Sequence, residues 1–249
     1  MKTDTFNIIC IVWSVVGISS FVLLQFVRAP YGRHIKKGWG PEIPNNLGWI
    51  LMELPSFLII LYFTLISSQS NYASMLSLLW LIHYFNRTFI FPFRIRTKRK
   101  KIPLAIVLSA IFFNTVNASL NGFYLSVLEQ YTSDSFQYWN FYLGIFLFVI
   151  GFLINQISDN HLIHLRKPGE TGYKIPKKFL FKYISCPNHL GELIQWAGFA
   201  ILAWNLPALS FFIWTAANLL PRAAGHHKWY KKHFENYPKN RKALIPKLW

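Results

Sequence analysis

Long apolar runs separated by short polar loops make up most of the sequence. The first run, Phe6–Phe26, has 21 residues and no charged side chain, which is the length that one helix needs to cross about 30 Å of hydrocarbon. We therefore predict an all-α, polytopic membrane protein that forms a single integral-membrane domain over residues 1–249. The seven predicted transmembrane helices are Phe6–Phe26, Leu47–Ile66, Met75–Phe93, Leu104–Leu128, Tyr138–Ile157, Leu190–Leu206 and Pro207–Leu220.

The loops alternate between basic and nearly uncharged. The segment 67–73 has no charge and the segment 129–137 has only Glu129 and Asp134. Because positively charged loops stay in the cytoplasm, we expect the N-terminus outside and the C-terminus in the cytoplasm, which requires an odd number of crossings. The basic loops contain Arg28, Arg33, Lys36 and Lys37, then Arg94, Arg96, Lys98, Arg99, Lys100 and Lys101, then Arg166, Lys167, Lys174, Lys177, Lys178 and Lys182, and finally the segment after Pro221.

Composition narrows the classes of function. The net charge is +17 with 53% hydrophobic residues, but the basic residues lie in blocks between apolar runs, so nucleic acid is not an expected partner. Cys10 and Cys186 do not form a pattern for a disulfide or for zinc. The first apolar run lacks a small-residue cleavage site and is read as a retained helix. We expect a multi-pass protein of the endoplasmic reticulum membrane or of a bacterial inner membrane.

Several polar residues interrupt the apolar runs. Glu53 lies in the second run, and Tyr84 and Arg87 lie in the third. Ionisable groups inside hydrocarbon are costly and usually functional, so these three residues are candidate site residues. A stripe of Asn114, Asn117 and Asn121 lies along one face of the fourth run, and its spacing fits hydrogen bonds between helices as well as it fits a ligand site.

A second polar cluster lies on the predicted cytoplasmic side, in segments 155–170, 183–196 and 221–246. Its cations, carboxylates, amides and aromatic rings suit a dinucleotide, because arginine pairs with phosphates. The sequence contains neither the glycine-rich dinucleotide fingerprint nor a P-loop, and a basic face near anionic lipids would look similar. His161 and His164 have a spacing suitable for a metal, but no thiolate or carboxylate pattern joins them, so no metal site is predicted.

Five stretches resemble signature segments of the steroid 5α-reductase family. They are "LMELPSF" from Leu51, "HYFNRTF" from His83, "RKPGE" from Arg166, "SCPNHLGELIQW" from Ser185 and "HHKWYKKHFENYPKNRKALIP" from His226, and the match runs in order from about Tyr31. The resemblance implies a seven-helix membrane enzyme that uses NADPH to reduce the Δ4 double bond of 3-ketosteroids. Hydride goes to C5, a proton goes to C4, and the product is a 5α-dihydrosteroid.

The resemblance also implies residue roles. Glu53 and Tyr84 would hold the C3 oxygen, where negative charge develops. Since a carboxylate cannot donate a hydrogen bond, Glu53 is expected to be protonated or to share a proton with Tyr84. The substrate part would lie in about 1–128 and the NADPH part in about 138–249. The resemblance implies three groups of cofactor residues. Asn155, Asp159, Asn188 and Glu192 would contact the nicotinamide and ribose, Arg87, Arg166 and Arg222 would contact the phosphates, and His226 and Tyr230 would also line the site. Because Gly225 precedes the histidine pair, it stays open whether His226 or His227 faces the cofactor.

Other functions remain open from the sequence. A trans-2-enoyl-CoA or polyprenol reductase belongs to the same superfamily, and "SCPN" also occurs in the enoyl-CoA branch. An isoprenylcysteine-type membrane methyltransferase has a similar C-terminal region but no need for Glu53 and Tyr84 together. A non-catalytic, lipid-binding membrane protein is the fourth interpretation. The steroid interpretation is favoured by Glu53 followed by Leu-Pro-Ser-Phe.

Overall fold

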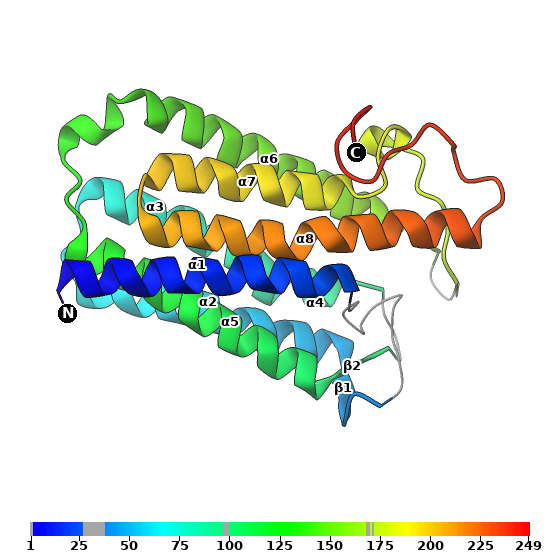
Figure 1. Ribbon diagram of the computed structural model, residues 1–249, viewed down its shortest axis with the longest axis horizontal. Coiled ribbons are helices and arrows are strands. Elements are labelled where there is room, and N and C mark those ends of the chain that lie inside the picture. Colours follow the sequence, from blue (N-terminus) through cyan, green and yellow to red (C-terminus); the bar gives the residue numbers. More distant parts are fainter. Residues whose placement is uncertain (1, 27–37, 97–99, 168–169, 171) are drawn as a thin grey trace. The chain divides into compact units, whose positions relative to one another are not determined.

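A computed structural model describes residues 2–26, 38–96, 100–167, 170 and 172–249, and these residues are mostly helical (Figure 1). The basic residues Arg28, Arg33, Lys36, Lys37, Lys98 and Arg99, and the Pro-Gly of "RKPGE", lie outside the described residues. The elements in chain order are α1 (Thr3–Phe26), β1 (Glu42–Pro44), α2 (Asn45–Ile66), α3 (Asn71–Phe85), η2 (Asn86–Ile90), α4 (Phe91–Arg94), β2 (Lys101–Pro103), α5 (Leu104–Phe123), η3 (Tyr124–Leu128), η4 (Ser133–Phe136), α6 (Trp139–His164), η5 (Phe179–Lys182), α7 (Pro187–Ala203) and α8 (Leu206–His233).

The chain forms two compact units. Unit 1 consists of Met1–Cys10, Ala29–Phe141 and Leu206–Ala208, and unit 2 consists of Ile11–Arg28, Tyr142–Asn205 and Leu209–Trp249. Helix α1 is divided between them: Phe6 packs on the ring of Phe123 in unit 1, and Trp13 packs on Trp214 in unit 2. Each unit holds one of the two polar clusters seen in the sequence.

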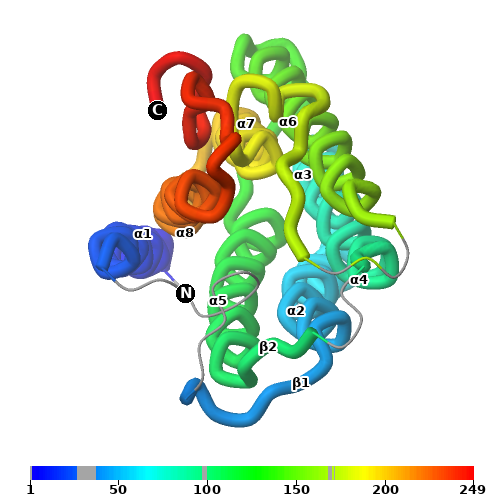
Figure 2. The backbone as a smooth tube through the Cα atoms, turned by 90° about the vertical axis from the view of Figure 1, so that its right-hand side faces the viewer, coloured from blue at the N-terminus to red at the C-terminus, as the bar shows by residue number. Residues whose placement is uncertain are grey.

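Unit 1 is organised around α2 and α5, which begin side by side. Strands β1 and β2 pair antiparallel, with Ile43 opposite Ile102, and each strand ends on the proline that precedes a helix, Pro44 before α2 and Pro103 before α5 (Figure 2). The prediction of a mostly helical fold is confirmed, with two extended three-residue segments paired where the helices start. This pairing sets the register of the two helices.

A segment of π-helix continues α3 toward α4. It covers Asn86–Ile90 and leads into the short helix α4. The wider turn of a π-helix changes which side chains share a face, and such turns are frequent at functional sites. Here the change falls directly after Tyr84, at Arg87.

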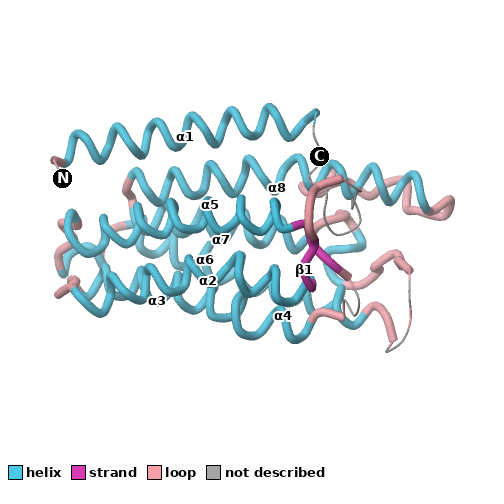
Figure 3. Tube along the Cα trace, turned by 90° about the horizontal axis from the view of Figure 1, so that it is seen from below, coloured by secondary structure: helices cyan, strands magenta, loops and turns pink. Residues whose placement is uncertain are grey.

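Unit 2 is built on α6, α7 and α8, which run lengthwise together in Figure 3. Helices α6 and α7 approach closely because glycines face the opposite backbone: a Cβ on Gly151 would overlap the backbone of Gln195, and a Cβ on Gly191 would overlap that of Asn155. Two residues join α7 to α8, and one of them, Trp204, adopts a left-handed conformation with φ of 47°. The predicted spans Leu190–Leu206 and Pro207–Leu220 thus correspond to two helices joined by a two-residue connection.

Four helices are long and apolar enough to cross a membrane among the described residues: Thr3–Phe26, Asn45–Ile66, Leu104–Leu128 and Trp139–His164. The predicted span Leu104–Leu128 matches one of them in both bounds. Helix α3 has 15 residues but continues through η2 and α4 to Arg94. Helix α7 has 17 residues, which is at the short end of the length that a full span needs. Helix α8 continues through Pro221 to His233, so much of the expected C-terminal loop is helical. Seven crossings and the orientation of the termini stay predictions.

Candidate functional site

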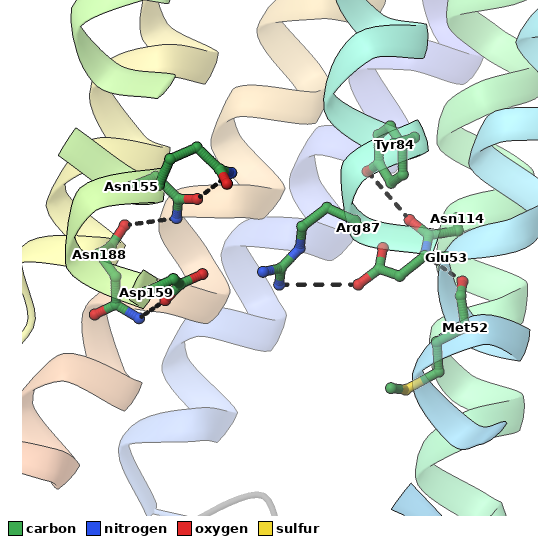
Figure 4. A network of polar contacts seen from close by, with 9 residues as sticks. Met52, Glu53, Tyr84, Arg87, Asn114, Asn155, Asp159 and Asn188 are labelled. Atoms are coloured by element: carbon green, nitrogen blue, oxygen red, sulfur yellow. Dashed lines mark hydrogen bonds and ion pairs between the residues drawn. The ribbon is translucent and has the colours of Figure 1, made fainter. Parts of the chain in front are cut away.

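The first polar cluster is centred on an ion pair between α2 and the π-helical segment. The Arg87 Nη2 atom lies 4.0 Å from the Glu53 Oε1 atom, and both side chains are largely buried, with 11% and 14% exposure (Figure 4). The Arg87 guanidinium also lies over the rings of Trp49 at 4.9 Å and Phe91 at 4.6 Å. Such cation–π contacts gain strength when they are desolvated. Arg87, predicted from the resemblance to contact cofactor phosphates, thus has a carboxyl partner within unit 1.

Asn114 connects the two predicted substrate residues. Its Nδ2 atom donates to the Met52 carbonyl oxygen at 2.6 Å, and its side chain also hydrogen-bonds to the Glu53 carboxyl group. Its Oδ1 atom accepts from the Tyr84 hydroxyl at 3.5 Å. An amide offers two N–H donors and one carbonyl acceptor, so one buried side chain meets the backbone, Glu53 and Tyr84 at once. Asn114 was absent from the predicted site residues.

The other two asparagines of the stripe donate hydrogen bonds to backbone carbonyl groups. The Asn117 amide donates to the Phe113 carbonyl at 2.8 Å. The Asn121 amide donates to Asn117 and also to the Pro207 carbonyl at 3.3 Å. The stripe is therefore split, with Asn114 at the site and Asn121 in the packing role. The even spacing could not have revealed this difference.

Helix starts explain why Glu53 and Asn114 meet. Glu53 is eight residues after the start of α2 at Asn45, and Asn114 is ten residues after the start of α5 at Leu104. At 1.5 Å per residue, the two lie about 12 Å and about 15 Å along helices that begin together. Gly48 allows this approach, because a Cβ there would overlap the Ile102 side chain of β2.

Two buried hydroxyl groups lie next to these residues in sequence. Ser56, one turn after Glu53, and Thr88, beside Arg87, are fully buried. Their hydroxyl oxygens have no hydrogen-bond partner among the described residues. A buried polar group without a hydrogen-bond partner is costly, so both hydroxyl groups favour binding of a ligand with a polar atom nearby. Neither residue stood out in the sequence, because single hydroxyls are common in apolar helices.

The second cluster, in unit 2, joins α6 to the first turn of α7. The Asn188 Nδ2 atom donates to Asp159 Oδ1 at 3.1 Å, and the Asn155 Nδ2 atom donates to the Asn188 carbonyl at 3.1 Å (Figure 4). Between Asn155 and Asp159 lies Ser158, whose fully buried hydroxyl has no hydrogen-bond partner among the described residues. The structure therefore brings together three predicted cofactor residues. Glu192 follows Asn188 by one turn of α7.

Helix α8 carries the predicted residues Arg222, His226 and Tyr230 at intervals of four, on one face. The His226 ring packs near the His189 ring at 5.6 Å, whereas His227 is hydrogen-bonded to Ser185 at 2.6 Å. The Nδ1 atom of His227 is therefore engaged within the protein, which favours His226 as the histidine that faces the cofactor. Tyr230 is buried, and its ring stacks on Tyr237 at 5.3 Å with an angle of 11° between the rings.

Arg166 lies just beyond the end of α6. Its Nη1 atom donates to the Gly172 carbonyl at 3.3 Å, and its side chain is partly buried. The structure thus places this cation two residues after the helix that carries Asn155 and Asp159. For metals, the described part of the chain has no group of three His, Cys, Asp or Glu side chains arranged to hold an ion.

Comparison with known proteins agrees with the signature segments. A family model described as 3-oxo-5-alpha-steroid 4-dehydrogenase matches residues 100–249. The chain is 38% identical over 240 residues to a steroid 5-alpha-reductase DET2 of Gossypium hirsutum, covering 93% of each chain. It is 41% identical to 3-oxo-5-alpha-steroid 4-dehydrogenase 1 of Mus musculus, covering 92% of this chain and 91% of the relative. It is 39% identical to 3-oxo-5-alpha-steroid 4-dehydrogenase 2 of Homo sapiens, covering 94% and 93%. The chain belongs to the steroid 5-alpha-reductase family of oxidoreductases.

Proposed function

We propose that this protein reduces the Δ4 double bond of a 3-ketosteroid with NADPH and releases the 5α-dihydro product. The observation that carries the proposal is the buried cluster of Glu53, Asn114 and Tyr84 inside apolar helices of unit 1. The relatives named as steroid 5-alpha-reductases supply the substrate class. A steroid partitions into the bilayer, so its ketone arrives from the same medium in which these helices are expected to lie.

The polar cluster suits the charge that the reaction creates. When bound, NADPH would supply the hydride that reaches C5, the β-carbon of the enone. Negative charge then develops on the C3 oxygen, and preorganised donors in a dry site stabilise it. Tyr84 and Glu53 are the proposed donors, and a proton added at C4 completes the reduction.

Asn114 organises the donors. Its amide N–H groups go to Met52 and Glu53, while its carbonyl accepts from Tyr84. In this arrangement the Tyr84 proton points to Asn114. We infer that the steroid ketone replaces the long 3.5 Å contact as the acceptor for Tyr84, because a hydroxyl has only one proton to donate.

The polar groups of unit 2 fit a dinucleotide. The Ser158 hydroxyl gives a buried, unsatisfied group beside Asn155 and Asp159, which a polar ligand would satisfy. Asn155, Asp159, Asn188 and Glu192 would hold the nicotinamide and ribose, and Arg166 and Arg222, with Arg87 as a further candidate, would hold the phosphates, with His226 and Tyr230 beside them on α8. The net charge of +17 favours a cofactor with an additional 2′-phosphate, hence NADPH.

The proposal includes a multi-pass membrane topology. It places seven crossings with the N-terminus outside and the C-terminus in the cytoplasm, where the cofactor is dissolved. The four long apolar helices support membrane insertion. The paired strands β1 and β2 bring the starts of α2 and α5 to one end of unit 1, which fits two basic loops on one side of the bilayer.

The test is turnover by the full chain purified in detergent. NADPH oxidation is followed with a 3-keto-Δ4-steroid and, separately, with a 2-enoyl thioester, and the products are identified. We expect steroid-dependent oxidation and a 5α-dihydro product. Oxidation with the thioester alone would assign the protein to lipid elongation. Oxidation with neither substrate would reject both reductase assignments and require an assay for methyl transfer.

A further inference from the structure

A hydrogen-bonded group behind the start of α7 is outside the predicted site residues. The Ser185 hydroxyl lies 2.6 Å from His227 Nδ1, 2.6 Å from the Tyr237 hydroxyl and 3.0 Å from the Lys242 carbonyl oxygen. Ser185 and Tyr237 are buried. These groups come from the segment before α7, from α8 and from the chain after α8. We call Ser185, His227 and Tyr237 the C-terminal clamp.

We propose that the C-terminal clamp is a positioning device for the cofactor, which holds the first turn of α7 and the end of α8 in the arrangement that binds NADPH. The inference rests on the proposed function, because it takes Asn188 and Glu192 on α7 and His226 on α8 as cofactor residues. Ser185, His227 and Tyr237 act through those residues and are positioning residues.

Proton counting limits the directions of the bonds in the clamp. A hydroxyl has one proton, and a carbonyl can only accept. With the Ser185 proton on the Lys242 carbonyl, the Ser185 oxygen accepts from His227 Nδ1–H and from the Tyr237 hydroxyl. With the other histidine tautomer, Ser185 donates to His227 Nδ1 and still accepts from Tyr237. In both arrangements Ser185 joins His227 to Tyr237.

The charges around the clamp support this assignment. Burial, with smaller contributions from Lys231, Arg241 and Lys242, lowers the pKa of His227 to about 4. The ring is then neutral near pH 7, with one N–H group. The buried Arg241 guanidinium lies 4.9 Å from the centre of the Tyr237 ring and hydrogen-bonds to the Tyr237 side chain. Tyr237 thus accepts from Arg241 while it donates to Ser185.

The backbone connects the clamp to α7. The Ser185 N–H donates to the Lys242 carbonyl at 2.8 Å, and the Cys186 N–H donates to the Ala243 carbonyl at 3.2 Å. Helix α7 starts at the next residue, Pro187, and Asn188 is three residues after Ser185. Figure 1 shows the C-terminal segment curling beside the start of α7. A shift of Ser185 is therefore passed to Asn188 within one helical turn.

The same clamp reaches α8. His227 follows His226 directly, and the Tyr237 ring stacks on Tyr230 at 5.3 Å. Both predicted cofactor residues on this part of α8 are thus adjacent to a clamp residue. One network thus connects the predicted cofactor residues on α7 with those on α8. The side chains that form this network are not themselves predicted cofactor residues.

The experiment measures NADPH binding to the full chain in detergent, by fluorescence or calorimetry, together with steady-state kinetics. The His227→Leu variant loses the donor to Ser185, whereas His227→Asn places an amide donor near the former Nδ1 position. We expect His227→Leu to weaken NADPH binding about tenfold, the effect of one buried hydrogen bond with its partner left unsatisfied. We expect His227→Asn to restore most of the affinity. The matched control is His233→Leu, at an exposed position of the same helix, with unchanged affinity.

Kinetics separate positioning from a general loss of stability. The clamp predicts a KM for NADPH raised about tenfold in Ser185→Ala and Tyr237→Phe, with kcat at saturating NADPH and the KM for steroid close to those of the parent. The double variant should lose no more affinity than Ser185→Ala alone, because that change already removes the contact between Ser185 and Tyr237. A lower melting temperature with unchanged NADPH affinity would overturn the proposal and leave the clamp a structural contact. If the parent protein itself does not bind NADPH, the proposed function fails and this inference fails with it.

Discussion

The buried polar side chains of the two clusters are stabilised by different kinds of contact. In unit 1, the Arg87 guanidinium lies 4.0 Å from the Glu53 carboxyl group and is covered by the rings of Trp49 and Phe91. In unit 2, amides and one carboxylate bond partly to backbone, as Asn155 does to the Asn188 carbonyl. The first arrangement needs specific side chains on three elements. The second needs two helices close enough for side chain and backbone to meet, and glycine provides that.

This difference separates the expected consequences of mutation. Changes in the first cluster should act on the reaction rate, since its groups are proposed to meet the charge that develops on the steroid. Changes in the second cluster should act on cofactor affinity. Four measurements follow, from the largest expected effect to the smallest.

The largest effect is expected for Tyr84→Phe. This change removes the proposed donor to the C3 oxygen and keeps the ring that stacks on Trp80 at 5.3 Å. Loss of one such donor costs about 10²–10³ in kcat. Turnover and NADPH affinity are measured on the same preparation, and affinity should stay unchanged. Tyr62→Phe, at a position with 59% exposure, is the control, and equal turnover in both variants would remove Tyr84 from the reaction.

The second cluster is tested with Asn155→Ala. The change leaves the Asn188 carbonyl without its donor. We expect the Kd for NADPH to rise by about 5- to 150-fold, corresponding to about 1–3 kcal/mol for an unsatisfied buried group, with little change in kcat at saturation. Asn160→Ala, at an exposed position on the same helix, is the matched control. A fall in kcat alone would contradict the division between the two clusters.

The glycine contact is tested with Gly191→Ala. The new Cβ would overlap the backbone of Asn155, so α6 and α7 must separate slightly. Overpacking of this kind costs about 1–3 kcal/mol and lowers the melting temperature of a chain of this size by about 2–4 °C per kcal/mol. NADPH affinity should fall as well, because Asn155 and Asn188 move apart. An unchanged melting temperature would show that the helices tolerate a Cβ at their contact.

The smallest effect is the pH dependence contributed by His227. Its pKa is lowered to about 4 from the ordinary 6.5, so the unfolded chain binds more protons between these values and stability decreases as pH falls from about 6.5 toward 4. Thermal unfolding across this range should show the loss in the parent and a smaller loss in His227→Asn. Parallel pH profiles for the two proteins would contradict the neutral assignment of His227.

Parts of this molecule could be predicted because their signals are local. A lone glutamate in an apolar run and a Tyr-x-x-Arg pair in the next run identify Glu53, Tyr84 and Arg87 as unusual, and the structure brings Glu53 and Arg87 together. The span Leu104–Leu128 follows directly from its apolar length. The identity of the family is also carried by contiguous motifs.

Other parts depend on contacts between distant segments. The role of Asn114 depends on where α2 and α5 start, which is set by the pairing of residue 43 with residue 102. The course of α8 through Pro221 depends on tertiary packing that outweighs the local preference of proline. His227 was set apart from His226 only by the position of Ser185, about 40 residues earlier in the sequence.

The strand pair has a consequence for synthesis of the chain in the membrane. Glu42 pairs with Pro103, so the start of α2 acquires its partner only after about 60 further residues have been made. At about 5–20 residues per second, this takes roughly 3–12 seconds. Throughout that interval Glu53 must sit in or near the bilayer without Asn114, and for the first part of it without Arg87. Nascent chains halted before residue 114 should therefore depend on the insertion machinery to shield this carboxyl group, a dependence that ends when Asn114 has been made and α5 packs beside α2.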